Sequence, residues 1–419
     1  MVRPLLSRMN WHSASLKQSL GAFLLSLGIA SGMAGGCQHA EMKPDVPTIE
    51  LSSGSFARKW VADLGFKEDE VTDIFVRDTL VIVYTRNHLA HVLDRESGEN
   101  KWVVQVGAEG VKLRPPVVLK NIVVFPTIST MEVYNRFGKE HRSVLASGFA
   151  LRSGATGNGT RLYYGADDPN GGRVVSLDLA GSQYQISSVN WTLQTRSGIS
   201  ATPAIQQGLL YAADDSGGIY AVNAETRAPI WAIKHEGREE GVFGTGARIQ
   251  ADLKADDYGL YAASMDTKLY CIGRTDGRIR WQYFAGQPLT QSPTVTATTV
   301  YQFIDGTGVV AIDKTQGDPV RKAKWTVPNA IQFLAEDEKY TYLERSDHVI
   351  VAVERSTGSA KFQSKRTDFV AYATALKNNI VFSATRDGQI RAIMPNFRAG
   401  AMGEMVWEPA NHESLAAAN

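Results

Sequence analysis

The stretch ATPAIQQGLLYAADDSGGIYAVNAETRAPIWAIK, residues 201–234, contains four short segments in which apolar residues alternate with others. The segments are TPAI, GLLYAAD, GIYAVNA and PIWAI, and turns rich in glycine, aspartate and asparagine separate them. Alternation with a period of two, together with β-branched and aromatic residues, predicts β-strands rather than helices. The stretch is therefore expected to form one four-stranded antiparallel sheet.

The same phrase recurs along the chain, and the aromatic residue that closes each copy marks the period. Successive closing residues are mostly 37 to 50 residues apart, and the one double-length gap contains a degenerate copy that ends near Val144. A glycine stands four residues before the aromatic residue in SGENKW, DGRIRW and TGSAKF, so the turn belongs to the repeat. The closing aromatic residues are Trp60, Trp102, Trp191, Trp231, Trp281, Trp325, Phe362 and Trp407.

Paired central strands occur eight times, from TLVIVYT with LAHVLD to NIVFSAT with QIRAIM. A four-stranded sheet cannot bury both of its faces alone, so sheets of this period stack radially as propeller blades. The sequence predicts an all-β, eight-bladed β-propeller in which each closing aromatic residue docks against the next blade. The segment FARKWVADL, residues 56–64, precedes the first copy. We expect it to pair with the last blade near MVWEPA, or to replace part of that blade, and so to close the ring.

The first 36 residues have the order of a bacterial lipoprotein signal peptide. Three basic residues precede the apolar run LGAFLLSLGIASGMAGG, which is too short and too rich in glycine for a good membrane span. The small residues AGG precede Cys37, as in a lipobox, so Cys37 is expected to carry the lipid anchor. Gln38 follows it where an aspartate would favour the inner membrane, so the outer membrane is the expected destination in a Gram-negative source. The alternative is an ordinary secretory signal with a chance cysteine.

The expected organisation after the signal peptide is a lipidated cysteine and flexible tether at residues 37–55, a monomeric propeller at residues 56–409 and a disordered tail at residues 410–419. The chain has 44 lysines and arginines against 43 aspartates and glutamates. Its net charge is therefore too small to attract nucleic acid electrostatically. Cys271 lies in the apolar segment KLYCIG, where a buried small hydrophobic residue is expected rather than a reactive thiol.

Two polar groupings could suggest metal sites. Asp167, Asp168 and Asn170 in ADDPNGG carry oxygen ligands for Ca²⁺, but the run lacks the later carboxylate of a calcium loop, and a tight turn is the preferred interpretation. His88 and His91 are three residues apart, which on a strand would place them on opposite faces, so they are not expected to share a metal. The glycine-rich run KHEGREEGVFGTGAR at residues 234–248 is expected to be a solvated connection between blades, with an exposed recognition loop as the alternative.

The repeat, in its best copy SATPAIQQGLLYAADDSGGIYAVNAETRAPIW, resembles the PQQ-like repeat of quinoprotein propellers, and the resemblance covers residues 56–407. In quinoprotein dehydrogenases this fold holds pyrroloquinoline quinone over a tryptophan floor, beside Ca²⁺ bound by Glu and Asn, with an Asp as base and often a vicinal disulfide. The present chain has no adjacent cysteines, and every tryptophan except Trp11 stands in the docking column. No catalytic, cofactor-binding or metal-ligating residue is therefore assigned, and the chain is not expected to be an enzyme.

In its lipobox, its size and its eight copies, the chain is similar to the BamB family of propeller lipoproteins of the outer-membrane protein assembly machinery. That resemblance implies a lipid-anchored scaffold in the cell envelope, facing the periplasm, with envelope proteins such as the β-barrel assembly machinery as partners. Two other functions stay open at this point: a redox enzyme that binds pyrroloquinoline quinone, and an envelope propeller that binds a carbohydrate or another small ligand.

Overall fold

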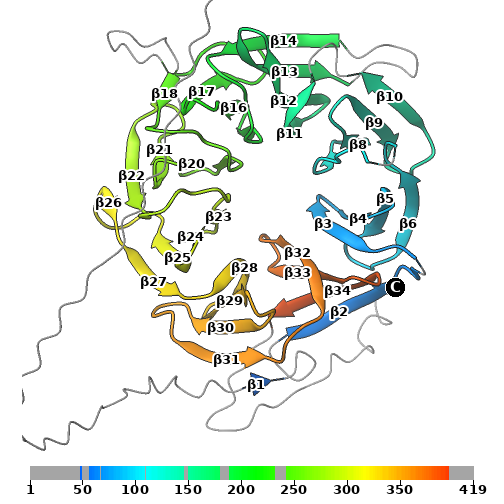
Figure 1. Cartoon of the computed structure of the whole chain (residues 1–419), viewed down its shortest axis with the longest axis vertical. Helices are drawn as coiled ribbons and strands as arrows, with labels where there is room; N and C mark the ends of the chain where they lie inside the picture. The colour runs from blue at the N-terminus through cyan, green and yellow to red at the C-terminus, as the bar shows by residue number, and fades with distance from the viewer. Residues whose placement is uncertain are drawn as a thin grey trace, which may run out of the picture. The chain divides into compact units, whose positions relative to one another are not determined.

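The computed structural model describes residues 48–49, 56–66, 68–108, 110–145, 150–179, 188–231 and 242–395. The regular secondary structure of these residues consists entirely of β-strands, which form eight sheets. Figure 1 shows the sheets arranged in a ring. The predicted all-β class and the eight-bladed propeller are confirmed. None of the described segments forms a helix that is long and apolar enough to cross a membrane.

In blades 1 to 7 the chain passes from the innermost to the outermost strand. Blade 1 contains β3 Val71–Arg77, β4 Leu80–Thr85, β5 Leu89–Asp94 and β6 Asn100–Gln105. Blade 2 contains β7 Val117–Val118, β8 Ile122–Pro126, β9 Thr130–Asn135 and β10 His141–Leu145. Blade 3 contains β11 Leu151–Asn158, β12 Arg161–Asp168, β13 Gly171–Asp178 and β14 Ser188–Thr195. Blade 4 contains β15 Ala204–Gln206, β16 Leu209–Ala213, β17 Gly218–Asn223 and β18 Val242–Gly244.

The second half of the ring repeats this order. Blade 5 contains β19 Lys254–Ala255, β20 Leu260–Ala263, β21 Lys268–Ile272 and β22 Ile279–Phe284. Blade 6 contains β23 Thr294–Val295, β24 Thr299–Ile304, β25 Gly308–Asp313 and β27 Ala323–Val327. Blade 7 contains β28 Ala330–Glu336, β29 Tyr340–Arg345, β30 Ile350–Glu354 and β31 Ala360–Ser364. Blade 8 contains β32 Phe369–Ala375, β33 Ile380–Thr385, β34 Gln389–Pro395 and β2 Phe56–Asp63.

The ring closes through β2, the strand that precedes the first repeat. It pairs antiparallel with β34, with Val61 opposite Arg391, and so forms the outermost strand of blade 8. The two ends of the described chain therefore complete one sheet, and the prediction that the segment replaces part of the last blade is confirmed. The segment MVWEPA and Trp407 lie outside the described residues, as do Cys37, the signal peptide and the predicted C-terminal tail.

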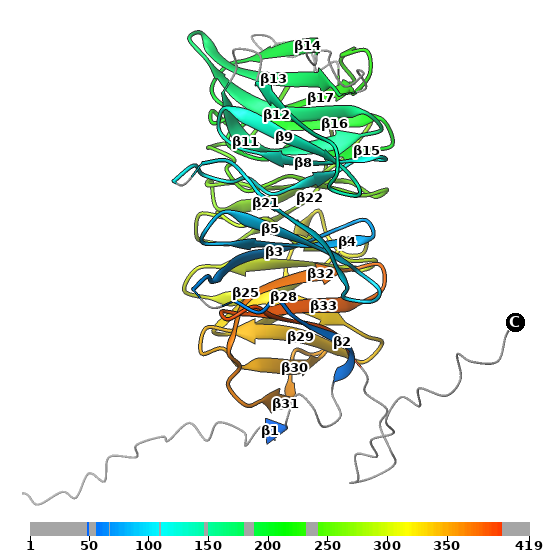
Figure 2. The ribbon, with the colours of Figure 1, turned by 90° about the vertical axis from the view of Figure 1, so that its right-hand side faces the viewer.

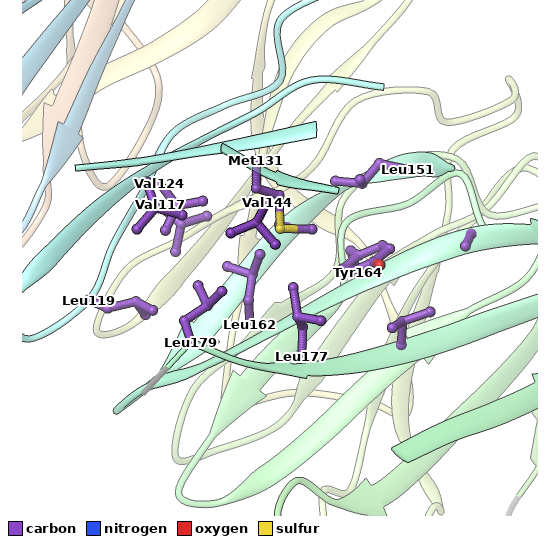
Figure 3. Close-up of a cluster of buried hydrophobic side chains, with 14 residues drawn as sticks. Val117, Leu119, Val124, Met131, Val144, Leu151, Leu162, Tyr164, Leu177 and Leu179 are labelled. Carbon is purple, nitrogen blue, oxygen red and sulfur yellow. The ribbon is translucent and has the colours of Figure 1, made fainter. Parts of the chain in front are cut away.

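The core lies mainly between neighbouring blades rather than in one central mass. Figure 3 shows one such cluster, in which Val124 and Met131 of blade 2 face Leu162 and Leu177 of blade 3. A second cluster joins blades 8 and 1 across the closure, where Trp60 and Phe382 of blade 8 pack in one cluster with Val81 and Leu93 of blade 1. Because both faces of each inner sheet are covered, the central strands are apolar at nearly every position rather than at alternate ones.

The strands of each blade run between the two faces of a disc, which Figure 2 shows from its edge. The turns between second and third strands, together with the connections between blades, lie at one face, which we name the connection face. The turns between first and second strands, and between third and fourth strands, lie at the other, which we name the hairpin face.

Blade 4 departs from the sequence expectations in its outer strand. The structure describes residues 229–231 of the predicted strand PIWAI, and these form a single bridge, between Pro229 and Val222; the fourth strand described in blade 4 is β18. Pro229 has no N–H to extend a ladder, which favours a break there. The run 234–248 is thus not wholly a connection between blades, because Val242–Gly244 pairs with β17.

Short parallel strands also extend two blades at their outer edges. β1 Thr48–Ile49 lies beside β31 of blade 7, although residues 37–55 were expected to be an unpaired tether. β26 Val320–Arg321 lies beside β22 of blade 5.

Candidate functional site

The closing tryptophans make one repeated contact between blades. In every copy for which the structure describes a tryptophan, the indole N–H donates to a backbone carbonyl at the start of the last turn of the next blade. The donor–acceptor pairs are Trp60–Arg95 (2.9 Å), Trp102–Arg136 (2.9 Å), Trp191–Ala224 (3.1 Å), Trp231–Arg274 (2.9 Å), Trp281–Lys314 (2.8 Å) and Trp325–Arg355 (2.9 Å). The side chain of Phe362 has no N–H group, and it packs in a cluster with Val381 and Ile393 of blade 8.

The repeated glycine receives the tryptophan of the preceding blade. Gly277 has a φ of 65°, and a Cβ there would lie 2.8 Å from Cδ2 of Trp231. Gly358 has a φ of 73°, and a Cβ would lie 2.6 Å from Cβ of Trp325. A larger residue would therefore be strained in its backbone and would also collide with the indole.

A basic side chain at the same turn adds a contact that sequence reasoning missed. It lies one or two residues after the last residue of the third strand and reaches the first turn of the preceding blade. The pairs are Arg136–Asp78 (2.5 Å), Arg274–Gln207 (2.9 Å), Lys314–Asp256 (2.9 Å) and Arg355–Thr298 (2.8 Å). The available signal was a basic residue just after the third strand, in the dipeptides NR, GR, DK and ER, because the position recurs in the repeat.

The connection face carries a network of charged side chains that spans blades 3 to 5. Arg152, in β11, donates to Asp167 Oδ1 at 2.7 Å and to Asp215 Oδ2 at 2.5 Å. Arg248, in the connection to blade 5, donates to Asp215 Oδ1 at 2.9 Å and to Ser200 Oγ at 2.8 Å. Asp215 therefore joins two arginines that are 96 positions apart in the chain. We name Arg152, Asp167, Ser200, Asp215 and Arg248 the arginine network.

The arginine network is ordered but remains accessible. The side chain of Arg248 is 40% exposed and that of Asp215 is 14% exposed. The hydrogen bond with Asp167 raises the pKa of Arg152, although partial burial opposes the shift. Gly198 lets the chain pass close to the network, because a Cβ there would lie 2.9 Å from Cζ of Arg152. Such partly exposed ion pairs contribute little to stability but present fixed charges to a partner.

A second candidate site lies along the inner strands of blades 5 to 8. A cavity of about 640 Å³ opens there, lined by residues of β19, β23, β28 and β32. Its wall combines the aromatic side chains of Phe303, Phe333 and Tyr372 with the polar side chains of Lys254 and Gln332. A volume of this size is within the range of small-molecule pockets. We name this cavity the channel cavity.

The candidate metal residues of the sequence lie in separate structural contexts. Asp168 ends β12, and its Oδ2 accepts a hydrogen bond from Nε of Arg173 at 2.5 Å, which lowers the pKa of Asp168. Asn170 lies in the tight turn before β13, as expected. His88 is not on a strand but in the turn before β5, with a φ of 60°, whereas His91 is buried within β5. Within the described ranges, no group of three or more potential metal-ligating side chains is gathered.

Cys271 lies in β21 and is fully buried, as expected. Burial raises the pKa of its thiol to about 12, so the reactive thiolate is scarce at neutral pH.

Comparisons with known proteins agree with this architecture. The family model described as outer membrane protein assembly factor BamB matches residues 55–232 and 216–331, more than half of the chain. Outer membrane protein assembly factor BamB of Escherichia coli K12 and that of Shigella dysenteriae are each 25% identical to the chain over 107 residues. Those alignments cover 24% of this chain and 27% of each relative, so they span about a quarter of the relatives' length.

Two solved structures share the fold. The crystal structure of BamB from Moraxella catarrhalis has a TM-score of 0.58 at 16% identity, covering 81% of this chain and 99% of that one. The computationally designed Ika8 protein has a TM-score of 0.56 at 14% identity, covering 79% of this chain and 98% of that one. These likenesses concern the fold alone, whereas the family match rests on sequence. The chain, a propeller of PQQ-like repeats, belongs to the family described as outer membrane protein assembly factor BamB.

Proposed function

We propose that this chain is a non-catalytic protein-binding scaffold in outer-membrane protein assembly, and that it binds its partner through the arginine network on the connection face. Membership of the family supports a role in outer-membrane protein assembly, and the arginine network supports the connection face as the binding surface. Arginine is enriched among the residues that dominate binding energy at interfaces. The single observation that carries the proposal is that Asp215 holds Arg152 and Arg248 in fixed positions while both guanidinium groups remain partly exposed.

The structure of the network favours a protein partner over a diffusing small molecule. Its members come from blades 3, 4 and 5, so they form a broad surface rather than a closed pocket. A rigid polar surface is pre-organised, which lowers the entropic cost of association. The partner that fits is a protein that offers carboxylates or carbonyl groups to the two arginines.

Substitution of Arg248 by alanine tests the assignment of the surface. We expect R248A to weaken binding of a barrel-assembly component by about tenfold or more, as truncation of an interface hot spot does. Affinity purification of the anchored protein after mild crosslinking provides the measurement. The matched control is R386A, because Arg386 is 68% exposed and belongs to the second turn of blade 8 on the same face.

The melting temperature should change little in both variants, since partly exposed ion pairs contribute at most about 1 kcal/mol. Equal recovery of the partner with R248A and R386A would contradict the assignment of the arginine network.

We further propose that the protein is held at the periplasmic face of the outer membrane by lipid on Cys37. The sequence order before Cys37 supports this proposal, and the residues concerned lie outside those that the structure describes. In a C37S variant the propeller should leave the membrane fraction and appear in the soluble periplasmic fraction, as followed by fractionation and immunoblotting. Persistence of C37S in the outer membrane after a high-salt wash would contradict lipid anchoring.

A further inference from the structure

The channel cavity combines an aromatic wall with a lysine that has no fixed partner. Phe303, Phe333 and Tyr372 line one part of the wall, and Lys254 of β19 lines another. Among the described residues, the ammonium group of Lys254 has no hydrogen-bond partner and no carboxylate within ion-pair distance, whereas the backbone of Lys254 pairs with β20. The side chain of Lys254 is exposed to solvent, although protein surrounds it at the wall of the channel cavity. Burial lowers the pKa of Lys254, and Arg77 lowers it further, while Asp252 opposes the shift.

Arg77 brings a second positive charge from the opposite side of the ring. It lies at the end of β3, directly before the first turn of blade 1, and Lys254 lies two residues before the corresponding turn of blade 5. Both residues are therefore at a similar height, towards the hairpin face. The guanidinium group of Arg77 is held by neutral acceptors, the carbonyl oxygens of Pro116 (3.0 Å) and Val76 (3.0 Å). Its charge is thus positioned without being neutralised.

Arg114 precedes β7, at the connection-face end of the inner strand of blade 2, and its guanidinium group is likewise held by a backbone carbonyl. Its Nη2 donates to the carbonyl oxygen of Arg152 at 2.6 Å, and its buried Nε has no partner among the described residues. The charge of Asp252 raises the pKa of Arg77, Arg114 and Lys254 against the effect of burial, so one carboxylate offsets part of three positive charges. Its Oδ1 is already occupied by the backbone N–H of Thr202 at 2.9 Å.

Other acids near the inner strands do not cancel this excess. Asp256 lines the channel cavity but is paired with Lys314 at 2.9 Å, and Glu336 is paired with Arg355 at 3.2 Å. A concave site with walls of low dielectric constant concentrates such a field, so the channel attracts negative charge.

We propose that the channel cavity binds a small amphipathic anion, whose acidic group pairs with Lys254 and whose apolar body packs against Phe303, Phe333 and Tyr372. The positive excess selects the acidic group, and the aromatic wall selects the apolar body. A cavity of about 640 Å³ accommodates a ligand of a few hundred daltons. This site is separate from the arginine network and does not depend on the scaffold function.

The probe 8-anilinonaphthalene-1-sulfonate, an aromatic monoanion, provides the test. Its fluorescence should increase saturably with one site per propeller, and it should bind more tightly than its uncharged relative N-phenyl-1-naphthylamine. In K254M the affinity for the sulfonate should fall by about tenfold or more, because a charge-assisted contact is lost. K254R should stay within about threefold of the parent protein, since it keeps the charge.

The matched control is K322M, because Lys322 is exposed and lies outside the channel cavity. Thermal unfolding of each variant verifies that the propeller is intact. The proposal is overturned if the sulfonate shows no saturable binding, if K254M binds it as tightly as K322M does, or if the charged and uncharged probes bind K322M equally well.

Discussion

Replacement of Trp281 by alanine is expected to lower the free energy of unfolding by about 3–5 kcal/mol, the range for a fully buried large side chain. Trp281 is 0% exposed, and its indole N–H donates to the carbonyl oxygen of Lys314 in blade 6 at 2.8 Å. Its ring also lies 6.1 Å from that of Tyr261 and beneath the guanidinium group of Arg321. The substitution would leave a cavity between two blades and an unpaired buried carbonyl.

Urea denaturation followed by far-UV circular dichroism measures this effect without relying on the fluorescence of the residue that is removed. W281F is the matched control: it keeps most of the apolar area and loses the hydrogen bond, so a smaller loss of about 1–2 kcal/mol is expected. A loss below about 1 kcal/mol for W281A would show that the closing tryptophans do not hold neighbouring blades together.

Deletion of β2 is expected to have the second large effect. A chain that begins after Asp63 would leave β34 with an unpaired edge and would lose Trp60, which is 8% exposed and donates to the carbonyl oxygen of Arg95 in blade 1. An open edge pairs readily with other chains. We expect this chain to lose cooperative thermal unfolding and to elute as aggregates in size-exclusion chromatography.

A chain that begins at Phe56 is the control for this deletion. It lacks Cys37 and β1, as the shorter chain does, but keeps β2, so the comparison isolates closure of the ring. It should unfold cooperatively and elute as a monomer. A cooperative, monomeric chain without β2 would mean that the eight blades close without this strand.

The repeated elements of the fold could be predicted from the sequence because each is specified many times. Eight copies place the central strands by their alternation, and the degenerate copy still forms blade 2, with β10 ending at Leu145. The closing role of residues 56–64 was also predictable, since a strand precedes the first copy and the ring needs an outer strand for its last blade. The strand with which β2 pairs was not predicted correctly. Pairing was expected near MVWEPA, which lies further along the chain than the observed partner, β34.

The features that occur once could not be predicted. β1 and β26 are two residues long, and so short a pairing leaves no periodic pattern. In blade 4, Pro229 forms an isolated bridge with Val222, and Val242–Gly244 pairs with β17 as the outer strand.

The candidate sites were hidden for a related reason. Arg152 and Asp215 meet across 63 positions, and Arg77 and Lys254 lie on the inner strands of opposite blades, so neither pair has a local motif. The repeat fixes where blades lie, but loops and inner strands carry side chains that differ from copy to copy. The basic residue after the third strand, as in Arg274 and Lys314, is the exception, because it recurs and could have been found.

Site-specific photo-crosslinking in the cell envelope tests the scaffold proposal most directly. Asn170 and Asn158 suit the comparison, because both are exposed and belong to blade 3, Asn170 at the connection face beside the arginine network and Asn158 at the hairpin face. With a photoreactive amino acid at position 170, irradiation should yield an adduct with a component of the barrel-assembly machinery, and the same amino acid at position 158 should yield none. The proposal is contradicted if no such adduct forms from position 170, or if position 158 gives it equally well.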